Sequence, residues 1–434
     1  MTRLRPSRSL LASLLALGVL AGPAVGCETA SPPAATAPPA PPSASQVVAS
    51  AARSTSASAA APAPAKPADN AIVIGERQTF RSSTMGEERA ILVYTPPSYK
   101  RGKAVYPVVY LLDGDGHFHH TTGLIQFLAD NRRAPEMIVV GVANTDRSRD
   151  LSPTPDKDYP SSGGGGKFLS FLKDELRTRI EGAYRTAPYR ILIGHSLGGL
   201  FAVHALTTSP DAFNAYVSIA PSLWWDKELM RRQAEELFTK SPDLQSFLYI
   251  TLGKEPGRMA DSNKAFTAML KAKAPKGLNW SFTSMERENH VTIPHRTTYD
   301  ALEKLFAGWE APEKLDNVKD LQAHYEALSK KFSFEIKIPE NALNNLGYQL
   351  MATRKDEALA AFQLNVKLYP ESANVYDSLA EAYEKSGNIA LAKTNYDMAV
   401  RKATETADPS LSVFKQNLER FTDKQKTAPK APAP

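Results

Sequence analysis

Short apolar runs alternate with longer amphipathic stretches between residues 70 and 310 of this 434-residue chain. Residues 105–112 and 137–143 are almost continuously apolar, as are strands that are buried on both faces of a sheet. Residues 72–80 and 89–95 alternate apolar with polar side chains, which predicts early antiparallel strands. Further strands are predicted at 190–193, 215–219, 247–252 and 280–284, and helices near 166–181, 197–208, 227–239, 262–273 and 294–307. This alternation predicts a mostly parallel, eight-stranded sheet covered by helices, the α/β class.

After Pro312 the strand signals nearly stop, and small and large side chains recur at helical spacing. Corresponding positions of two copies lie 34 residues apart, which is the period of tetratricopeptide repeats. The second copy contains Tyr376, Leu379, Ala380, Tyr383, Ala392, Tyr396 and Ala399, and the first contains Leu343, Leu346, Gly347, Leu350, Ala358, Phe362, Asn365 and Pro370. The first helix of the earlier copy fits only if its turn is one residue shorter. We predict an all-α region with tetratricopeptide-like repeats at 340–406; a generic helical hairpin is the alternative.

The N-terminus has the order of a secretory signal: basic residues, an apolar run at 10–20, and then small residues. A membrane-spanning helix needs about 20 apolar residues, more than this run supplies. The run ends before Cys27, the single cysteine of the chain, in a segment AVGC (24–27) that resembles a bacterial lipobox. We expect an exported lipoprotein of the bacterial cell envelope, in the outer membrane or periplasm, anchored to a membrane by lipid on Cys27. Ordinary signal cleavage without lipidation is the alternative.

Composition separates flexible from folded segments. Residues 28–69 are almost entirely Ala, Pro, Ser and Thr, and such a segment has too little apolar surface to fold. A tail rich in Lys, Ala and Pro begins after about residue 423 and is expected to be disordered. The predicted organisation is a signal peptide at 1–26, a disordered linker at 27–69, an α/β domain at 70–310, a connecting helical segment at 311–339, tetratricopeptide-like repeats at 340–406, and a C-terminal segment with a disordered tail at 407–434.

The charge pattern excludes some partners. The formal net charge of +6 is small for this length, and no run of Lys and Arg is interleaved with aromatic residues, so no nucleic-acid partner is expected. His117, His119 and His120 are close together, but no acidic or cysteine partners recur near them at a fixed spacing. No metal or organic cofactor is implied.

A serine nucleophile is predicted in the segment GHSLG, residues 194–198. The apolar strand 190–193 precedes it, and an apolar helix follows it. A strand, a tight glycine-flanked turn and a helix together push the hydroxyl of the central residue, Ser196, into the open. The alternative is a glycine-rich turn without catalysis.

A serine hydroxyl needs a base to take its proton, and in this arrangement the chain order is serine, acid, histidine. Only His290, His295 and His324 follow the helix after Ser196, and His324 belongs to the C-terminal region. His290 lies between the last predicted strand and the last helix, so we predict it as the base. His295 is the alternative, and we expect it on the helix surface.

The acid that orients the base should follow the strand at 247–252. We predict Glu255 for this role, with Asp261 and Glu288 as alternatives. The oxyanion that develops during attack needs preorganised N–H donors. We predict the backbone N–H of Leu197, directly after the nucleophile, and that of Asp115, after the strand ending at 112; a simple glycine turn is the alternative at Asp115.

Four segments together resemble the esterase-D-like branch of α/β hydrolases, which includes enterochelin esterases, S-formylglutathione hydrolases and feruloyl or acetylxylan esterases. They are YLLDG at 110–114, RSRDLSPT at 147–154, GHSLGG at 194–199 and APSLWW at 220–225. The second and fourth are more particular to siderophore-esterase-like members. The resemblance implies the α/β-hydrolase fold and a serine carboxylic-ester hydrolase that acts on a small-molecule ester.

Two of these segments supply candidate substrate contacts. Arg149 follows a central strand at its carboxyl end, where ligands bind in open α/β sheets, and pairing with Asp150 is its alternative role. Trp224 and Trp225 are candidate walls of an aromatic-acyl pocket, and capping the core is their alternative role.

The function expected from the sequence is an exported serine esterase that forms an acyl-enzyme on Ser196, with a siderophore-ester or acyl-sugar substrate. Two alternatives remain open. One is a non-catalytic surface lipoprotein that binds a protein partner through its repeats, because a fold does not establish an activity. The other is an acyltransferase, in which an alcohol replaces water.

Overall fold

A computed structural model describes residues 70–427. The predicted signal peptide (1–26), Cys27, the linker up to residue 69 and the residues after 427 lie outside the described residues. The predicted tail was expected to begin after about 423, but the last helix, α14 (Leu411–Thr427), continues to Thr427. The buried Phe421 explains this, because its ring packs 5.2 Å from that of Tyr396 and holds the last turns in place.

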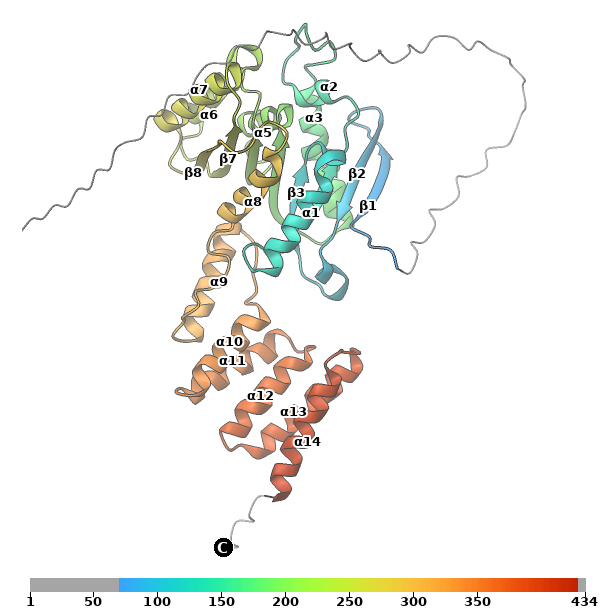
Figure 1. Cartoon of the computed structure of the whole chain (residues 1–434), viewed down its shortest axis with the longest axis vertical. Coiled ribbons are helices and arrows are strands. Elements are labelled where there is room, and N and C mark those ends of the chain that lie inside the picture. The colour runs from blue at the N-terminus through green and yellow to red at the C-terminus, as the bar shows by residue number, and fades with distance from the viewer. Residues whose placement is uncertain (1–69, 428–434) are drawn as a thin grey trace, which may run out of the picture. The chain divides into compact units, whose positions relative to one another are not determined.

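One eight-stranded sheet forms the centre of the described chain, with the strand order β1-β2-β4-β3-β5-β6-β7-β8 (Figure 1). Strand β2 pairs antiparallel with β1 and with β4, and the other neighbouring pairs are parallel. The strands are β1 (Glu76–Arg81), β2 (Glu88–Tyr94), β3 (Tyr106–Leu111), β4 (Ile138–Val142), β5 (Thr186–His195), β6 (Ala215–Ile219), β7 (Ser246–Gly253) and β8 (Leu278–Met285). The prediction of a mostly parallel α/β-hydrolase sheet is confirmed.

The first strand differs from its prediction. It begins at Glu76 rather than at residue 72, and the side chain of Ile72 is 95% exposed. Strand β5 starts at Thr186 and is longer than predicted. The prediction missed its first residues because Pro188 and Arg190 interrupt an otherwise apolar run. The apolar pattern therefore located both strands but misplaced their ends.

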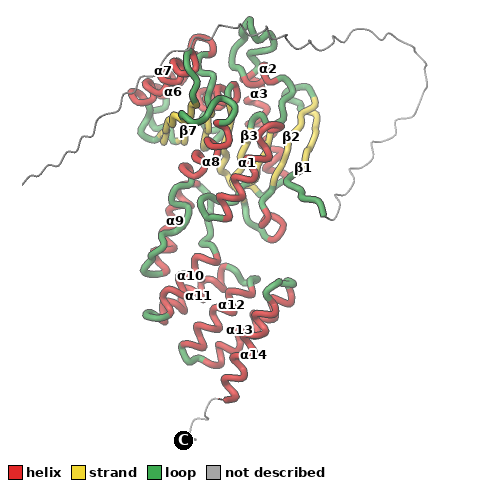
Figure 2. Tube along the Cα trace, in the orientation of Figure 1, coloured by secondary structure: helices red, strands yellow, loops and turns green. Residues whose placement is uncertain are grey.

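Alternate side chains of the central strands enter two separate apolar clusters. Val108 and Tyr110 of β3 face a cluster with helices α5, α6 and α7, whereas Val109 and Leu111 face a cluster with α1, α8 and α9. The period-two alternation of a strand explains this division. Because helices cover both faces of the sheet (Figure 2), its open positions for chemistry lie at the strand ends.

Most helices follow the prediction. Those of the hydrolase part are α1 (Gly114–Asp130), α2 (Arg147–Leu151), α3 (Gly165–Ser170) with a π-helical continuation (Phe171–Leu176) into α4 (Arg177–Ala183), α5 (Leu197–Thr208), α6 (Trp225–Lys240), α7 (Arg258–Lys273) and α8 (Ile293–Leu305), with a short 3-10 helix at Pro97–Arg101. Helix α1 was not predicted, because Gly114 and Gly116 at its start indicated a turn. Gly114 is required by close approach: a Cβ there would lie 2.6 Å from the backbone of Gly141.

The part after residue 310 is all-helical. Its helices are α9 (Val318–Phe332), α10 (Glu340–Met351), α11 (Lys355–Leu368), α12 (Ala373–Lys385), α13 (Ile389–Glu405) and α14. Helix α9 packs on the sheet through Phe332, whose ring centroid lies 5.1 Å from that of Tyr189 and 5.0 Å from that of Phe306. In the pair α10 and α11, a Cβ on Gly347 would lie 2.5 Å from the Phe362 ring, so the small residue permits close helix packing.

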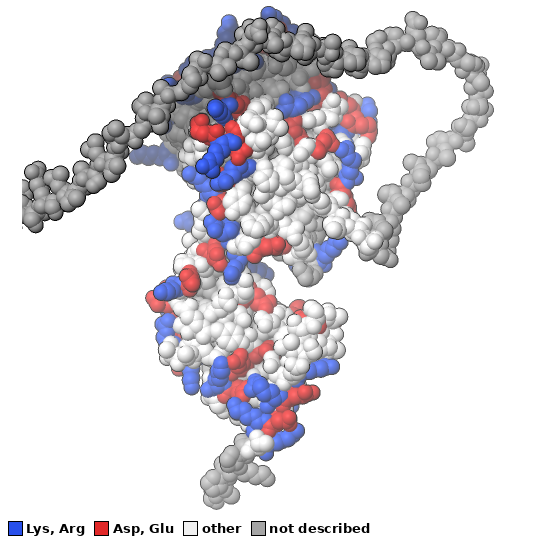
Figure 3. Space-filling model, viewed as in Figure 1, with Lys and Arg blue, Asp and Glu red and all other residues white. Residues whose placement is uncertain are grey.

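Charged side chains of both signs are interspersed over the face drawn in Figure 3. Among residues 70–427, no helix combines the length and the apolar character needed to cross a membrane.

Candidate active site

A strained turn at Ser196 joins the end of β5 to the start of α5. Ser196 has φ 60° and ψ −112°, a conformation that is unusual for a residue with a side chain. A Cβ on Gly194 would lie 2.1 Å from the carbonyl oxygen of Gly198, so the turn cannot accept a larger residue there. The GHSLG segment therefore folds as a strand, a tight elbow and a helix, with the Ser196 side chain half-buried.

Two neighbouring strands end in the same strained way. Asp113 follows β3 with φ 52°, and Ala220 follows β6 with φ 41°. Both segments touch the elbow: the N–H of Ser222 donates to the carbonyl oxygen of Ser196 at 3.2 Å, and a Cβ on Gly198 would lie 3.3 Å from Oδ2 of Asp113. Positive φ values thus mark the carboxyl ends of three adjacent strands, where strained residues gather at functional sites.

His290 and Glu255 are brought together by the loops after β8 and β7. His290 Nδ1 lies 2.5 Å from Oε2 of Glu255, and the two loops are joined by a 2.8 Å hydrogen bond from the N–H of Lys254 to the carbonyl oxygen of Glu288. The Glu255 side chain is 10% exposed and that of His290 is 39% exposed. A buried carboxylate beside a more open imidazole is the arrangement that orients a general base.

The alternatives occupy other positions. Asp261 lies exposed in the first turn of α7, and no hydrogen bond in the described chain joins it or Glu288 to His290. His295 lies exposed on α8, as the sequence predicted for it. Glu255 is thus the candidate acid that contacts the histidine.

His290 also lies beside the elbow. Its ring centroid is 4.6 Å from that of His195, the residue directly before Ser196. Within residues 70–427, no hydrogen bond links the Ser196 hydroxyl to His290. Bonds between a nucleophile and its base are often long in a free enzyme and tighten when substrate binds.

Leu197 and Asp115 each lie in the first turn of a helix, α5 and α1 respectively. Backbone N–H groups in a first turn have no partner within the helix, and they carry the positive end of the helix dipole. The Asp115 side chain is occupied, since it pairs with Arg77. Its backbone N–H therefore stays the candidate donor to an oxyanion.

Arg147 was not among the predicted site residues, yet it ties the elbow together. Its guanidinium donates to both carboxylate oxygens of Asp113, at 2.6 and 2.9 Å, and to the carbonyl oxygen of His195 at 3.1 Å. Asn144 donates to the same carboxylate at 2.7 Å. Burial would raise the pKa of Asp113, but the hydrogen bonds and charge of Arg147 hold it below its usual value. Both residues lie in motifs that carry the family resemblance, Asp113 in YLLDG and Arg147 in RSRDLSPT, but the motifs do not show that the two side chains meet.

The imidazoles of His117, His120 and His195 lie close together beside the elbow. His117 Nδ1 lies 3.0 Å from His120 Nε2, and the His117 ring is 5.8 Å from that of His195. Burial, with neighbouring imidazoles adding to it, lowers the pKa of His120 and of His195 to about 4. No group of three or more His, Cys, Asp or Glu residues within 70–427 is arranged to hold a metal ion.

Comparison with known proteins agrees with this geometry. The family model named Esterase matches residues 82–292, a span that contains Ser196, Glu255 and His290. A solved structure of an IroE-like serine hydrolase from Shewanella oneidensis is 30% identical, with a TM-score of 0.60, and the match covers 66% of this chain and 98% of that one. The chain belongs to this esterase family.

Curated relatives of the esterase carry related names. The ferri-bacillibactin esterase BesA of Bacillus subtilis is 28% identical over 52% of this chain and 87% of its own length. The siderophore triacetylfusarinine C esterase of Aspergillus fumigatus is 28% identical over 42% of this chain and 70% of its own length. The protein is therefore a carboxylic-ester hydrolase of the siderophore-esterase-like family.

The predicted substrate contacts of the esterase lie in different surroundings. Arg149 donates to both oxygens of Glu87, at 2.9 and 2.5 Å, and to Asp150 at 2.8 Å, so its pairing role is the one observed. Trp225 is fully buried, and its Nε1 donates to Thr154 Oγ1 at 3.1 Å, which makes it a core residue. Trp224 is only partly buried.

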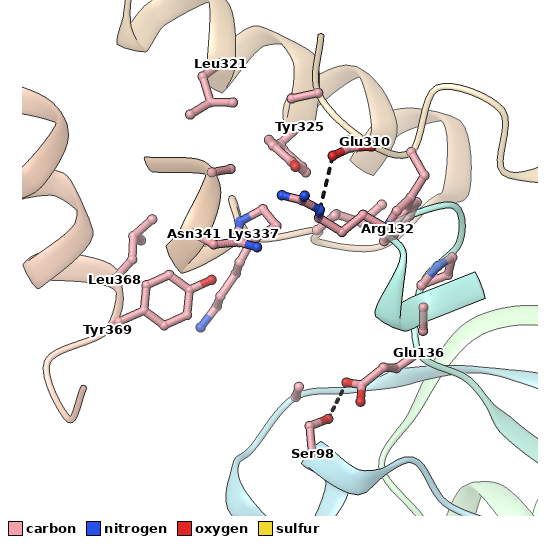
Figure 4. Close-up of a pocket in the computed structure, with 18 of the residues that line it drawn as sticks. Ser98, Arg132, Glu136, Glu310, Leu321, Tyr325, Lys337, Asn341, Leu368 and Tyr369 are labelled. Carbon is pink, nitrogen blue, oxygen red and sulfur yellow. Dashed lines mark hydrogen bonds and ion pairs between the residues drawn. The ribbon is translucent and has the colours of Figure 1, made fainter. Parts of the chain in front are cut away.

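A large cavity of the esterase lies away from Ser196. It has a volume of about 1810 Å³ and lies beside the amino ends of β3 and β4, opposite the edge that carries Ser196. Helices α9 and α10 close its other side, and Figure 4 shows Arg132 paired with Glu310 and Ser98 with Glu136 inside it. This cavity is therefore not lined by the candidate catalytic residues Ser196, Glu255 and His290.

Proposed function

We propose that the protein is a serine esterase that forms an acyl-enzyme on Ser196, with His290 as base and Glu255 as orienting acid. The observation that carries the proposal is the 2.5 Å contact between His290 and Glu255 on the loops beside the Ser196 elbow. Chain order and strand ends are those of an α/β hydrolase.

In the proposed first half-reaction, Ser196 Oγ attacks the ester carbonyl carbon while Nε2 of His290 takes the hydroxyl proton. The N–H groups of Leu197 and Asp115 stabilise the negative oxygen that forms. The tetrahedral intermediate then expels the alcohol, which takes the proton from His290, and an ester bond to Ser196 remains.

In the second half-reaction, water attacks that ester and gives its proton to His290. The carboxylic acid leaves, and the Ser196 hydroxyl is restored. Glu255 keeps one imidazole tautomer and stabilises the charged ring in both halves. The 10% exposure of the Glu255 side chain supports this role, because a poorly solvated carboxylate interacts strongly with a cation.

We further propose a siderophore ester as the substrate class, supported by the names of the two curated relatives. Within this proposal, Ser196→Ala should lower kcat for p-nitrophenyl acetate by about 10³-fold or more and abolish labelling by a fluorophosphonate probe. Unchanged turnover and labelling in the folded variant would refute the proposal. Ferric and iron-free siderophore esters would then be compared as substrates, with acyl-sugar esters as the competing class.

We propose that the mature protein is an exported lipoprotein, on the basis of the residues up to Cys27 alone. Lipid labelling of the wild type against Cys27→Ala tests this, and equal labelling of both would refute the proposed lipidation.

We also propose that α10 to α13 are two tetratricopeptide-like repeats that bind a protein partner. The 34-residue spacing of Ala358 and Ala392, both fully or almost fully buried, supports the repeat.

A further inference from the structure

Trp224 and Arg258 form a stacked pair. The guanidinium carbon of Arg258 lies 3.7 Å from the centroid of the Trp224 ring, well within the range of a cation–π contact. The indole N–H of Trp224 donates to the sulfur of Met259 at 3.2 Å, which fixes the rotation of the ring. Trp224 is partly buried and Arg258 is exposed, so the pair presents a flat, positively charged surface.

The pair adjoins the candidate active site from two sides. Trp224 is two residues after Ser222, whose N–H contacts the carbonyl oxygen of Ser196. Arg258 is three residues after Glu255, which contacts His290. Consecutive Cα atoms are about 3.8 Å apart, so each member lies within about 12 Å of a residue that touches the proposed triad.

The pair of Trp224 and Arg258 is held in place by its surroundings. Asn263, almost fully buried, donates to the carbonyl oxygens of Pro221 at 3.0 Å and Met259 at 2.9 Å, and thereby joins the two segments. The backbone on either side of Trp224 is strained, with positive φ at Ala220 and at 226–228. Strain of this kind persists only where the surroundings determine the conformation, and it clusters at ligand sites.

Arg258 also differs from the other arginines near the elbow. Arg147 is bound by Asp113, and Arg149 by Glu87 and Asp150. In the part of the chain that the structure describes, no ion pair includes Arg258, so its N–H groups remain available. A guanidinium presents these donors in a planar fork that matches a carboxylate or a pair of phenolate oxygens.

We propose that Arg258 and Trp224 form a specificity site for esters whose acyl group is aromatic and negatively charged. The ring of the acyl group would pack against Trp224, and its anionic substituent would accept hydrogen bonds from Arg258. The inference rests on the proposed esterase function and names a preference within it. It assigns Arg258 no part in bond making or breaking.

The test compares three p-nitrophenyl esters: the benzoate, its 3-carboxy analogue, and the acetate. Arg258→Gln should lower kcat/KM for the 3-carboxybenzoate by about 10- to 100-fold, the loss expected for one charge-assisted hydrogen bond, and change the other two by less than about 3-fold. Trp224→Leu should lower kcat/KM for both aromatic esters and leave kcat/KM for the acetate unchanged. Arg258→Lys should retain part of the preference, since it keeps the charge and loses the fork.

Arg287→Gln is the matched control, because it removes an equal charge from the neighbouring loop without touching an aromatic ring. It should change all three esters by similar small factors. Equal losses in Arg258→Gln and Arg287→Gln, or equal losses for charged and neutral esters, would overturn the proposed specificity site. The wild type would still hydrolyse esters in that case, whereas failure of the esterase function itself would leave the wild type as inactive as Ser196→Ala. Circular dichroism and thermal unfolding establish that each variant is folded.

Discussion

The two ends of the parallel strands differ in what they offer a ligand. We call them the amino edge, where the strands begin, and the carboxyl edge, where they end. The amino edge borders a cavity of about 1810 Å³, in which Arg132 pairs with Glu310. The carboxyl edge holds the strained Ser196 and the contact between His290 and Glu255. The difference teaches that the candidate catalytic site is identified by its constrained backbone and by its paired acid and base. The position of the cavity does not identify it.

The largest effect should come from the acid at the carboxyl edge. Glu255→Gln keeps the shape of the side chain but removes the charge that orients His290, so kcat should fall by about 10²- to 10⁴-fold. Ester hydrolysis at saturating substrate measures this. Asp261→Asn, an equal change on the same side of the site, should stay near wild type; a larger loss in Asp261→Asn would move the acid to that residue.

The next effect concerns the support of the elbow. Arg147→Met leaves the Asp113 carboxylate buried without its main partner, and this should cost about 1 to 3 kcal/mol of unfolding free energy and lower kcat about 10-fold. Urea unfolding and steady-state kinetics measure the two quantities. Adding Asp113→Asn should restore part of the stability, because the charge is gone. A single variant as stable and active as wild type would show that the elbow holds its shape alone.

Acid should lower the free energy of unfolding through the buried histidines at the carboxyl edge. The pKa of His120 and of His195 is about 4 in the folded protein, below the ordinary value of 6.5. Between these values the unfolded chain binds more protons, so stability falls as the pH drops from about 6.5 towards 4 and does not depend on these groups above that window.

Thermal unfolding at several pH values measures this effect. His120→Gln should flatten the pH dependence of Tm, and the exposed His119→Gln should not. A wild-type Tm that stays constant down to pH 4 would contradict the expectation.

The smallest effect should appear at the amino edge. Lys337→Gln and Tyr369→Phe alter the lining of the large cavity, and each should change kcat/KM for p-nitrophenyl acetate by less than about 2-fold, as surface changes away from a site usually do. Assays of these variants against wild type check the comparison directly. A loss as large as that of Glu255→Gln would end the distinction between the two edges.

The sequence predicted the central features because they are local. Alternation of apolar runs located the eight strands, and glycine spacing around Ser196 located the elbow, since both depend on residues that are neighbours in the chain. Glu255 and His290 were reached through chain order, and the structure brings them into contact. Whether they act in catalysis stays a prediction.

Other features depend on distant partners and could not be predicted in this way. Arg147 lies 34 residues from Asp113, and no local pattern signals that their side chains meet. Arg149 has a similar sequence context, yet its guanidinium donates to the carboxylate of Glu87, which is distant in the sequence. Helix α1 was missed because its glycines indicate a turn unless one knows that Gly141 presses against Gly114.

The aromatic contact of Phe332 with Tyr189 has a consequence for how the protein can be divided. Tyr189 lies on β5, the strand whose far end carries Ser196. A protein shortened at residue 310 would expose Tyr189 and Phe306 to water and invite aggregation. Helix α9 thus belongs to the same folded unit as the sheet, and a shortened protein should retain it.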